Sequence, residues 1–254
     1  MSVATTFAGL GVAVALGALA FDRGGPGLAA VPVAIGAWLA LAAFVIAAHA
    51  RRRERRLGAA NTVTAVRAGI VAVLAGLVPD AARLAEPAML SWLWAATALA
   101  LLALALDGVD GWIARRRGES SAFGARFDME TDAALGLVMA LLIWRSGETG
   151  AWVLGLGTLR YLFVAASWRW PALAGELYPS LRRKTVCVVQ IAALALMLSP
   201  PVSAPASSAV GAVALALLSW SFARDAAWLL RRDAREGGAD ATGARSASPA
   251  GGSA

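Results

Sequence analysis

Long apolar runs are the feature of this sequence that most restricts its fold. Hydrophobic residues make up 59% of the 254-residue chain and charged residues only 15%, whereas a soluble domain has just under half and about a quarter. The apolar residues fall into runs of about 17 to 22 residues, the length of helix that crosses roughly 30 Å of hydrocarbon. We therefore expect an all-α integral membrane protein with about eight transmembrane helices. The expected spans are residues 3–21, 29–49, 60–78, 89–106, 128–145, 151–168, 184–199 and 207–230.

The basic residues indicate how these spans are oriented. The net charge is +7, but the arginines lie in short clusters just outside the apolar runs, which argues against a nucleic-acid partner. If the N-terminus is cytoplasmic and every span crosses, most of the 23 basic residues face the cytoplasm, in segments 51–56, 115–126, 169–184 and 224–245. We therefore expect a protein of the bacterial cytoplasmic membrane with both termini on the cytoplasmic side.

Four of the aspartates lie within 26 residues of one another. Asp107 and Asp110 directly follow one apolar run and are three residues apart, and Asp128 and Asp132 begin another and are four apart. Spacings of three and four place each pair on one helix face. Two antiparallel helices would then direct four carboxylates into one pocket near the cytoplasmic surface.

Such a pocket needs positive charge, because clustered carboxylates near a membrane repel one another and lose hydration. The chain has one cysteine and one histidine, which leaves almost no material for a Cys/His metal site. Carboxylate oxygens suit Mg²⁺ or Mn²⁺, and four of them suit two ions. Two metals can stabilise the attacking and leaving oxygens of a phosphoryl displacement.

The residues around these carboxylates fit a phosphate-containing ligand. Gly108, Gly111 and Ala114 leave room for a bulky ligand at the end of the first helix, and Gly124 does so at the start of the second. Arg115 is placed to neutralise a phosphate through two hydrogen bonds. A loop that merely joins two helices would not require this combination.

Asp107 to Asp132 reads D-x2-D-G-x2-A-R-x8-G-x3-D-x3-D. This pattern resembles the signature of the CDP-alcohol phosphotransferases, also called CDP-alcohol phosphatidyltransferases, at every fixed position. The segment from Asn61 through Thr64 to Arg67 is similar to the Asn-x-x-Thr-x-x-Arg opening of the family's first core helix. The resemblance covers about residues 61–230, which contain the six spans of the family core.

The resemblance implies an enzyme of the EC 2.7.8 type that moves a phosphoryl-alcohol unit from a CDP-linked alcohol onto a hydroxyl and releases CMP. It implies four metal ligands, of which the last also acts as the base: Asp107, Asp110, Asp128 and Asp132. It implies four positions that bind the CDP part: Gly111, Ala114, Arg115 and Gly124. It also leads us to expect a homodimer.

The acceptor alcohol stays open at this stage. Arg67, Arg160, Arg183 and Lys184 are candidates for binding a lipid phosphate or a phosphorylated acceptor, although the last two could serve only to orient the protein. The leading hypothesis is transfer of a phosphatidyl group from CDP-diacylglycerol to a small polar alcohol such as glycerol phosphate, inositol phosphate or serine. The alternatives are transfer of a headgroup from a soluble CDP-alcohol to a lipid hydroxyl, and a cation-binding transporter.

The sequence predicts that the chain has three parts. Residues 1–56 would form an additional N-terminal pair of spans with a basic loop, and residues 57–232 the catalytic domain. Residues 233–254 are rich in Gly, Ala and Ser, so we expect a disordered cytoplasmic tail.

Overall fold

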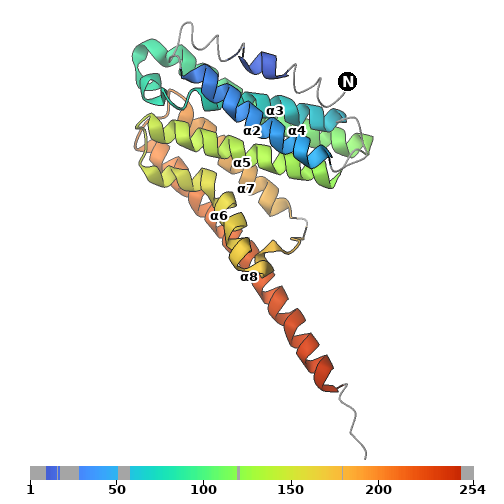
Figure 1. The fold of residues 1–254 in the computed structure, drawn as a ribbon. Helices are drawn as coiled ribbons and strands as arrows, with labels where there is room; N and C mark the ends of the chain where they lie inside the picture. Colours follow the sequence, from blue (N-terminus) through green and yellow to red (C-terminus); the bar gives the residue numbers. More distant parts are fainter. Residues whose placement is uncertain are drawn as a thin grey trace, which may run out of the picture.

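The fold is a helical bundle from which one long helix projects (Figure 1). The computed structural model describes residues 10–15, 17, 29–50, 58–118, 121–178 and 180–246. In this part of the chain every regular element is helical, as the sequence predicts. The α-helices that carry the fold are α2 (Ala30–Ala50), α3 (Ala59–Gly76), α4 (Leu90–Arg117), α5 (Ala122–Arg145), α6 (Leu154–Arg169), α7 (Leu181–Leu198) and α8 (Ala206–Ser246). Short 3-10 helices lie between them: η1 (Ala81–Ala85), η2 (Pro87–Met89), η3 (Ala151–Val153) and η4 (Pro171–Ala174).

Four helices in the described residues are long and apolar enough to cross a membrane. They are Ala59–Gly76, Pro87–Arg117, Ala151–Arg169 and Ala206–Ala234. The predicted count of eight spans is not confirmed. Helix α5 carries Asp128, Glu130 and Asp132 near its start, and α7 begins with three basic residues, so neither is as apolar as a simple span. The apolar part of α2 is shorter, Ala30–Ala43, and most of the expected span 3–21 lies outside the described residues.

Helix α3 lies at the centre of the contacts that build the site, because it packs against α2, α4 and α5. The main core joins α3 to α4, α5 and α7 through fully buried side chains such as Leu74, Met139 and Leu194. On α4 the buried apolar positions are Ala96, Ala100 and Ala103, and these small side chains allow the neighbouring helices to approach closely.

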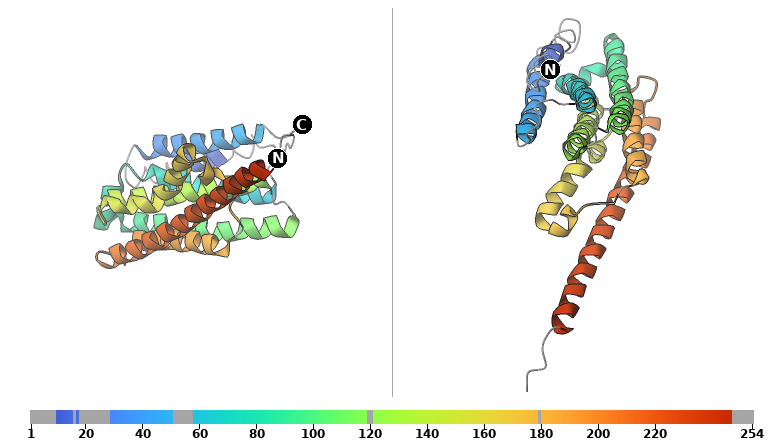
Figure 2. Two further views of the ribbon diagram at one scale, coloured as in Figure 1. Left: turned by 90° about the horizontal axis from the view of Figure 1, so that it is seen from below. Right: turned by 90° about the vertical axis from the view of Figure 1, so that its right-hand side faces the viewer.

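Helix α2 covers the other side of α3. Trp38 belongs to a second buried cluster with Ala65 and Ala68 of α3 and with Phe123 and Phe127 of α5. Phe127 directly precedes Asp128, and Phe123 lies one turn earlier on α5, so α2 packs behind the helices that carry the site. Figure 2 shows α2 and α8 on opposite sides of the bundle.

Two further contacts hold the remaining helices. A Cβ atom at Gly157 of α6 would lie only 2.5 Å from Leu137 Cα of α5, so the two backbones cross where no side chain fits. Between α7 and α8, Arg182 donates to the Ser221 hydroxyl at 2.6 Å and forms an ion pair with the buried Asp225.

The C-terminal helix differs from the sequence prediction. Helix α8 continues to Ser246, whereas composition predicted disorder from Asp233. Extending an existing helix costs far less than starting one, and the segment after Asp233 contains alanine, arginine and glutamate, which favour helix. Residues 247–254 lie outside the described part.

Candidate active site

The turn between α4 and α5 brings the two pairs of aspartates together. Helix α4 is followed by Gly118 in a left-handed conformation, with φ of 66°, which glycine adopts without steric cost. Ser121 then caps α5, because its hydroxyl accepts a hydrogen bond from the Gly124 backbone N–H at 3.0 Å. These local preferences reverse the chain so that the end of α4 and the start of α5 lie at the same end of the bundle.

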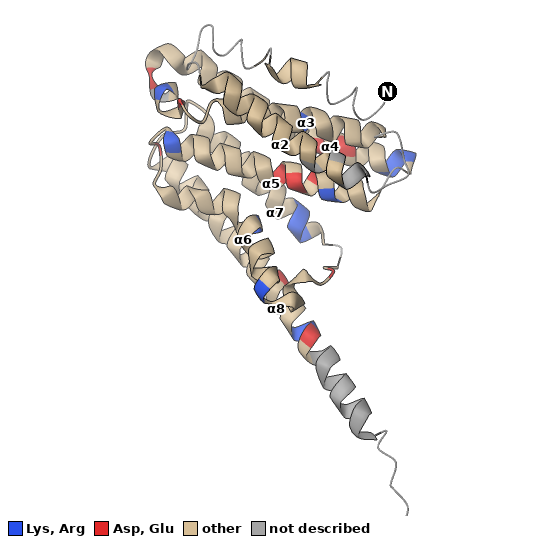
Figure 3. Cartoon of the chain, viewed as in Figure 1, with Lys and Arg blue, Asp and Glu red and all other residues tan. Residues whose placement is uncertain are grey.

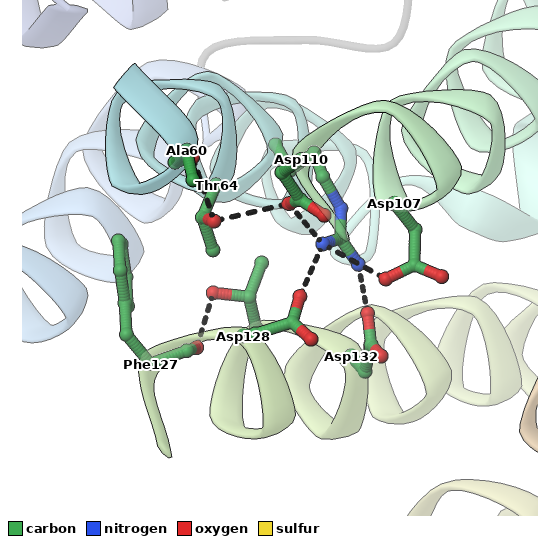
Figure 4. Close-up of polar contacts among 9 residues, drawn as sticks. Ala60, Thr64, Asp107, Asp110, Phe127, Asp128 and Asp132 are labelled. Atoms are coloured by element: carbon green, nitrogen blue, oxygen red, sulfur yellow. Dashed lines mark hydrogen bonds and ion pairs between the residues drawn. The ribbon is translucent and has the colours of Figure 1, made fainter. Parts of the chain in front are cut away.

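Asp107 and Asp110 on α4 face Asp128 and Asp132 on α5, as the spacing predicted (Figure 4). The two helices do not form this pocket by themselves, because α3 packs more extensively on each of them than they pack on each other. The carboxylates converge on the guanidinium of Arg67, which α3 inserts between them.

The guanidinium of Arg67 contacts all four carboxylates. Its Nη1 atom lies 3.1 Å from Asp107 Oδ1, 2.9 Å from Asp110 Oδ2 and 2.6 Å from Asp128 Oδ1. Its Nη2 atom donates to Asp132 Oδ1. The sequence analysis named Arg67 only as a candidate for binding a phosphate, and did not predict its place among the aspartates.

Burial is uneven across this cluster. The side chain of Arg67 is 1% exposed and that of Asp110 is 5% exposed, so both belong to the protein interior. The other three carboxylates are 27% to 39% exposed. The cluster is therefore closed at α3 and open toward Asp107, Asp128 and Asp132, where a ligand could reach it.

Three of the carboxylates could hold a metal ion together. One oxygen each of Asp107, Asp110 and Asp128 lie within 4.8 Å of one another. Oxygen-only donor sets of this kind suit Mg²⁺ or Mn²⁺. The donor chemistry thus fits the predicted metal site, and the identity and number of the ions stay predictions.

Thr64 and Asn61 are site residues that the sequence analysis named only as part of the motif that opens the first core helix, without a role at the site. Thr64 lies one turn before Arg67, and its hydroxyl is 3.0 Å from Asp110 Oδ2 and 3.2 Å from the Ala60 carbonyl. The Asn61 side chain lies against α5, since a Cβ atom at Gly124 would be 2.7 Å from Asn61 Oδ1. Their spacing of three with Arg67 is a signal of one shared helix face.

The predicted CDP-binding residues lie around the same helix ends. Arg115 is exposed and folds back along α4, so that a Cβ atom at Gly111 would lie 3.3 Å from its Nη1 atom. Gly124 has a packing role beside Asn61 as well as the predicted ligand role. Ala114 is half-buried on α4.

Apart from Arg67, the predicted acceptor-binding residues lie outside the aspartate cluster. Arg160 of α6 forms an ion pair with Glu130, which lies between Asp128 and Asp132 in sequence. Arg183 donates to the Tyr178 carbonyl and lies 3.6 Å from Asp225. Lys184 is exposed at the start of α7. The structure therefore does not bring these side chains together with Arg67.

Charge is concentrated at the end of the bundle that contains the site. Figure 3 shows the acidic residues of α4 and α5 at the same end as the basic residues that begin α7. Arg115, Arg116 and Arg117 form the last turn of α4 there. This end is consequently suited to anionic ligands that approach from water or from lipid headgroups.

A comparison with protein families gives this geometry its context. A family model described as CDP-alcohol phosphatidyltransferase matches residues 57–220. The chain belongs to this family. It is therefore a transferase, and the family assignment implies transfer of a phosphatidyl group from a CDP-alcohol to an alcohol acceptor, with a general dependence on divalent metal. No solved structure matches the chain.

The matched region begins just before α3 and ends within α8. It contains the three helices that form the aspartate cluster. Helix α2 precedes the match, although it packs against α3 and α5. The match therefore includes the chemical groups of the site but not the helix that covers α3 from behind.

Proposed function

We propose that this membrane enzyme transfers a phosphatidyl group from CDP-diacylglycerol to a small polar alcohol and releases CMP. The observation that carries the proposal is the convergence of the four motif aspartates from α4 and α5 (Figure 4). Within this cluster three carboxylate oxygens lie close enough to share a cation. The family relationship supports the reaction class, and the open side of the cluster supports access by substrate.

In this proposal Asp107, Asp110 and Asp128 hold the divalent metal, with Asp132 beside them as a ligand of a second ion. A bound Mg²⁺ or Mn²⁺ supplies positive charge that polarises the pyrophosphate and stabilises its leaving oxygen. Asp110 is the most buried of the four, and Thr64 orients it by hydrogen bonding. This buried pair keeps one side of the site rigid while the other three carboxylates meet the ligand.

Asp132 is the proposed base that accepts the proton of the acceptor hydroxyl. Its side chain is 30% exposed, so an alcohol can approach it from the open side of the cluster. The contact with Arg67 Nη2 orients the carboxylate. An aspartate is a weak base, and it suffices if the proton leaves as the hydroxyl attacks the phosphorus.

The CDP part would lie along the end of α4 and the start of α5. Gly111 and Ala114 leave space beside the helix, and Arg115 is exposed and free to turn toward a phosphate. Gly124 keeps the start of α5 narrow, because a side chain there would strike Asn61. These residues bind and orient the donor and do not take part in proton transfer.

The acceptor would lie between α5, α6 and α7. Arg160 is held near the aspartates by Glu130, and Arg183 and Lys184 begin the adjacent helix α7. All three would attract a phosphorylated acceptor or the lipid phosphate. We further propose that the enzyme works as a homodimer in a bacterial cytoplasmic membrane, with the site and both termini facing the cytoplasm.

The test is CMP release by the purified full-length chain with CDP-diacylglycerol, Mn²⁺ and a panel of alcohols. We expect release with one class of small alcohol and none after chelation of the metal. Asp128→Asn should abolish release, whereas the matched control Asp80→Asn, on the loop after α3, should retain it. Release from a soluble CDP-alcohol with a lipid acceptor would instead support headgroup transfer. Metal binding without CMP release from either donor would support a transporter and refute the proposed function.

A further inference from the structure

Arg67 occupies the position among the aspartates that a metal ion would take. Its Nη1 atom lies within 3.1 Å of one oxygen each of Asp107, Asp110 and Asp128. The same three acids form the group whose oxygens lie within 4.8 Å of one another. We infer that Arg67 is an internal counter-cation that fills this position in the metal-free protein and withdraws when the metal binds. This inference rests on the metal site of the proposed function.

The two cations exclude each other for geometric reasons. Carboxylate oxygens lie about 2.1 Å from Mg²⁺ and about 2.8 Å from a guanidinium nitrogen. A cation held by all three oxygens must therefore lie within the small space between them, where Nη1 lies. Two positive groups cannot share that space, so metal binding requires Nη1 to leave.

The charge of the cluster explains why Arg67 does not prevent metal binding. Four carboxylates surround a single guanidinium, so the group retains an excess of negative charge that still attracts a divalent cation. Arg67 reduces the repulsion enough to keep the helices together without metal. It also lowers the metal affinity, because each metal ion must compete with it.

The contact between Arg67 and Asp132 can persist when Nη1 leaves the other three carboxylates. Nη2 pairs with Asp132, which is not among the three acids that share the 4.8 Å group. A rotation about this pair would withdraw Nη1 from the other three and keep one ion pair intact.

The experiment measures Mn²⁺ affinity and thermal stability of the full-length chain in detergent, for the unmodified protein and for Arg67→Met. Met keeps the unbranched apolar part of the side chain, is shorter, and lacks the charged guanidinium. We expect Arg67→Met to melt lower without metal, yet to bind Mn²⁺ at least about tenfold more tightly, because the competing charge is gone. A purely structural arginine would instead lose both stability and affinity.

Two further variants complete the test. Arg145→Met removes an arginine at the far end of α5, where it donates to the Pro79 carbonyl, and should leave Mn²⁺ affinity unchanged. Arg67→Lys keeps the positive charge but lacks the two terminal nitrogen atoms with which arginine reaches several acids. It should raise the Mn²⁺ affinity less than Arg67→Met does. If Arg67→Met fails to fold, the Lys variant decides, since tighter binding supports the competition and equal or weaker binding overturns it.

The inference and the proposed function fail in different ways. If the unmodified protein releases CMP with Mn²⁺ but Arg67→Met binds the metal no more tightly, the inference alone is wrong. If Arg67→Met binds more tightly but the unmodified protein releases no CMP, the competition stands and the proposed reaction is wrong. Absence of Mn²⁺ binding in both proteins would overturn the metal site and the inference with it.

Discussion

Replacing Asp128 with Asn should separate metal binding from folding. Asp128 Oδ1 lies 2.6 Å from Arg67 Nη1, an attraction of roughly 6 kcal/mol at an effective dielectric constant of about 20. Asp107 and Asp110 each place one oxygen within 4.8 Å of an oxygen of Asp128, and their combined repulsion is at least roughly 7 kcal/mol on the same scale. The two effects nearly cancel, and Asp132 adds further repulsion.

Without metal, therefore, Asp128→Asn should lower the free energy of unfolding by no more than about 1 kcal/mol, a fall of the melting temperature below about 4 °C. With metal the result should differ. The unmodified protein should gain about 2.7 kcal/mol at a Mn²⁺ concentration one hundred times its Kd. The variant, which lacks one of three ligands, should gain little at that concentration. Thermal melts in detergent with and without Mn²⁺ measure both quantities.

Asp225→Asn is the matched control. Asp225 is likewise paired with arginine, namely Arg182 and Arg183, and is more buried than Asp128, but it does not belong to the carboxylate cluster found in the described residues. Because the attraction between Asp225 and the two arginines is not offset by comparable repulsion, this substitution should lower the free energy of unfolding by roughly 2 kcal/mol. It should leave the stabilisation by Mn²⁺ intact. The reasoning is refuted if Asp128→Asn destabilises the metal-free protein as much as Asp225→Asn, or if it keeps the full gain from metal.

Three further substitutions test other parts of the description. Asp132→Asn should reduce CMP release by at least about a hundredfold and leave the melting temperature nearly unchanged; retained turnover would exclude Asp132 as the base. Gly157→Ala should destabilise the protein by about 1–3 kcal/mol, because its Cβ would lie 2.5 Å from Leu137 Cα. Gly155→Ala, which meets only a flexible leucine side chain at 3.0 Å, is its control, and equal melting of the two would contradict the close crossing. Trp38→Ala should lower the melting temperature and also CMP release, since Trp38 supports the site from outside the family match; unchanged release would show that α2 does not position the site.

The helical class and the location of the carboxylates followed from local sequence. Apolar runs predict helices because their length matches the hydrocarbon thickness, and spacings of three and four place side chains on one face whatever their surroundings. For this reason Asp107 and Asp110, and likewise Asp128 and Asp132, could be paired before their environment was known. The number of spans was harder to predict, because α5 combines an apolar half with the acidic residues of the site.

Tertiary structure decided what lies between the carboxylates. The sequence showed that four acids in one pocket need a positive partner, but it does not distinguish a metal ion from an arginine in that role. Arg67 is 40 residues away from Asp107 in sequence, and only the packing of α3 between α4 and α5 brings its guanidinium within reach of all four. In the same way, the partners of Arg160 and Arg183 depend on helices whose contacts no local pattern specifies. Spacing along one helix is determined by the chain itself, whereas the choice of neighbouring helix depends on how the whole bundle buries its apolar surfaces.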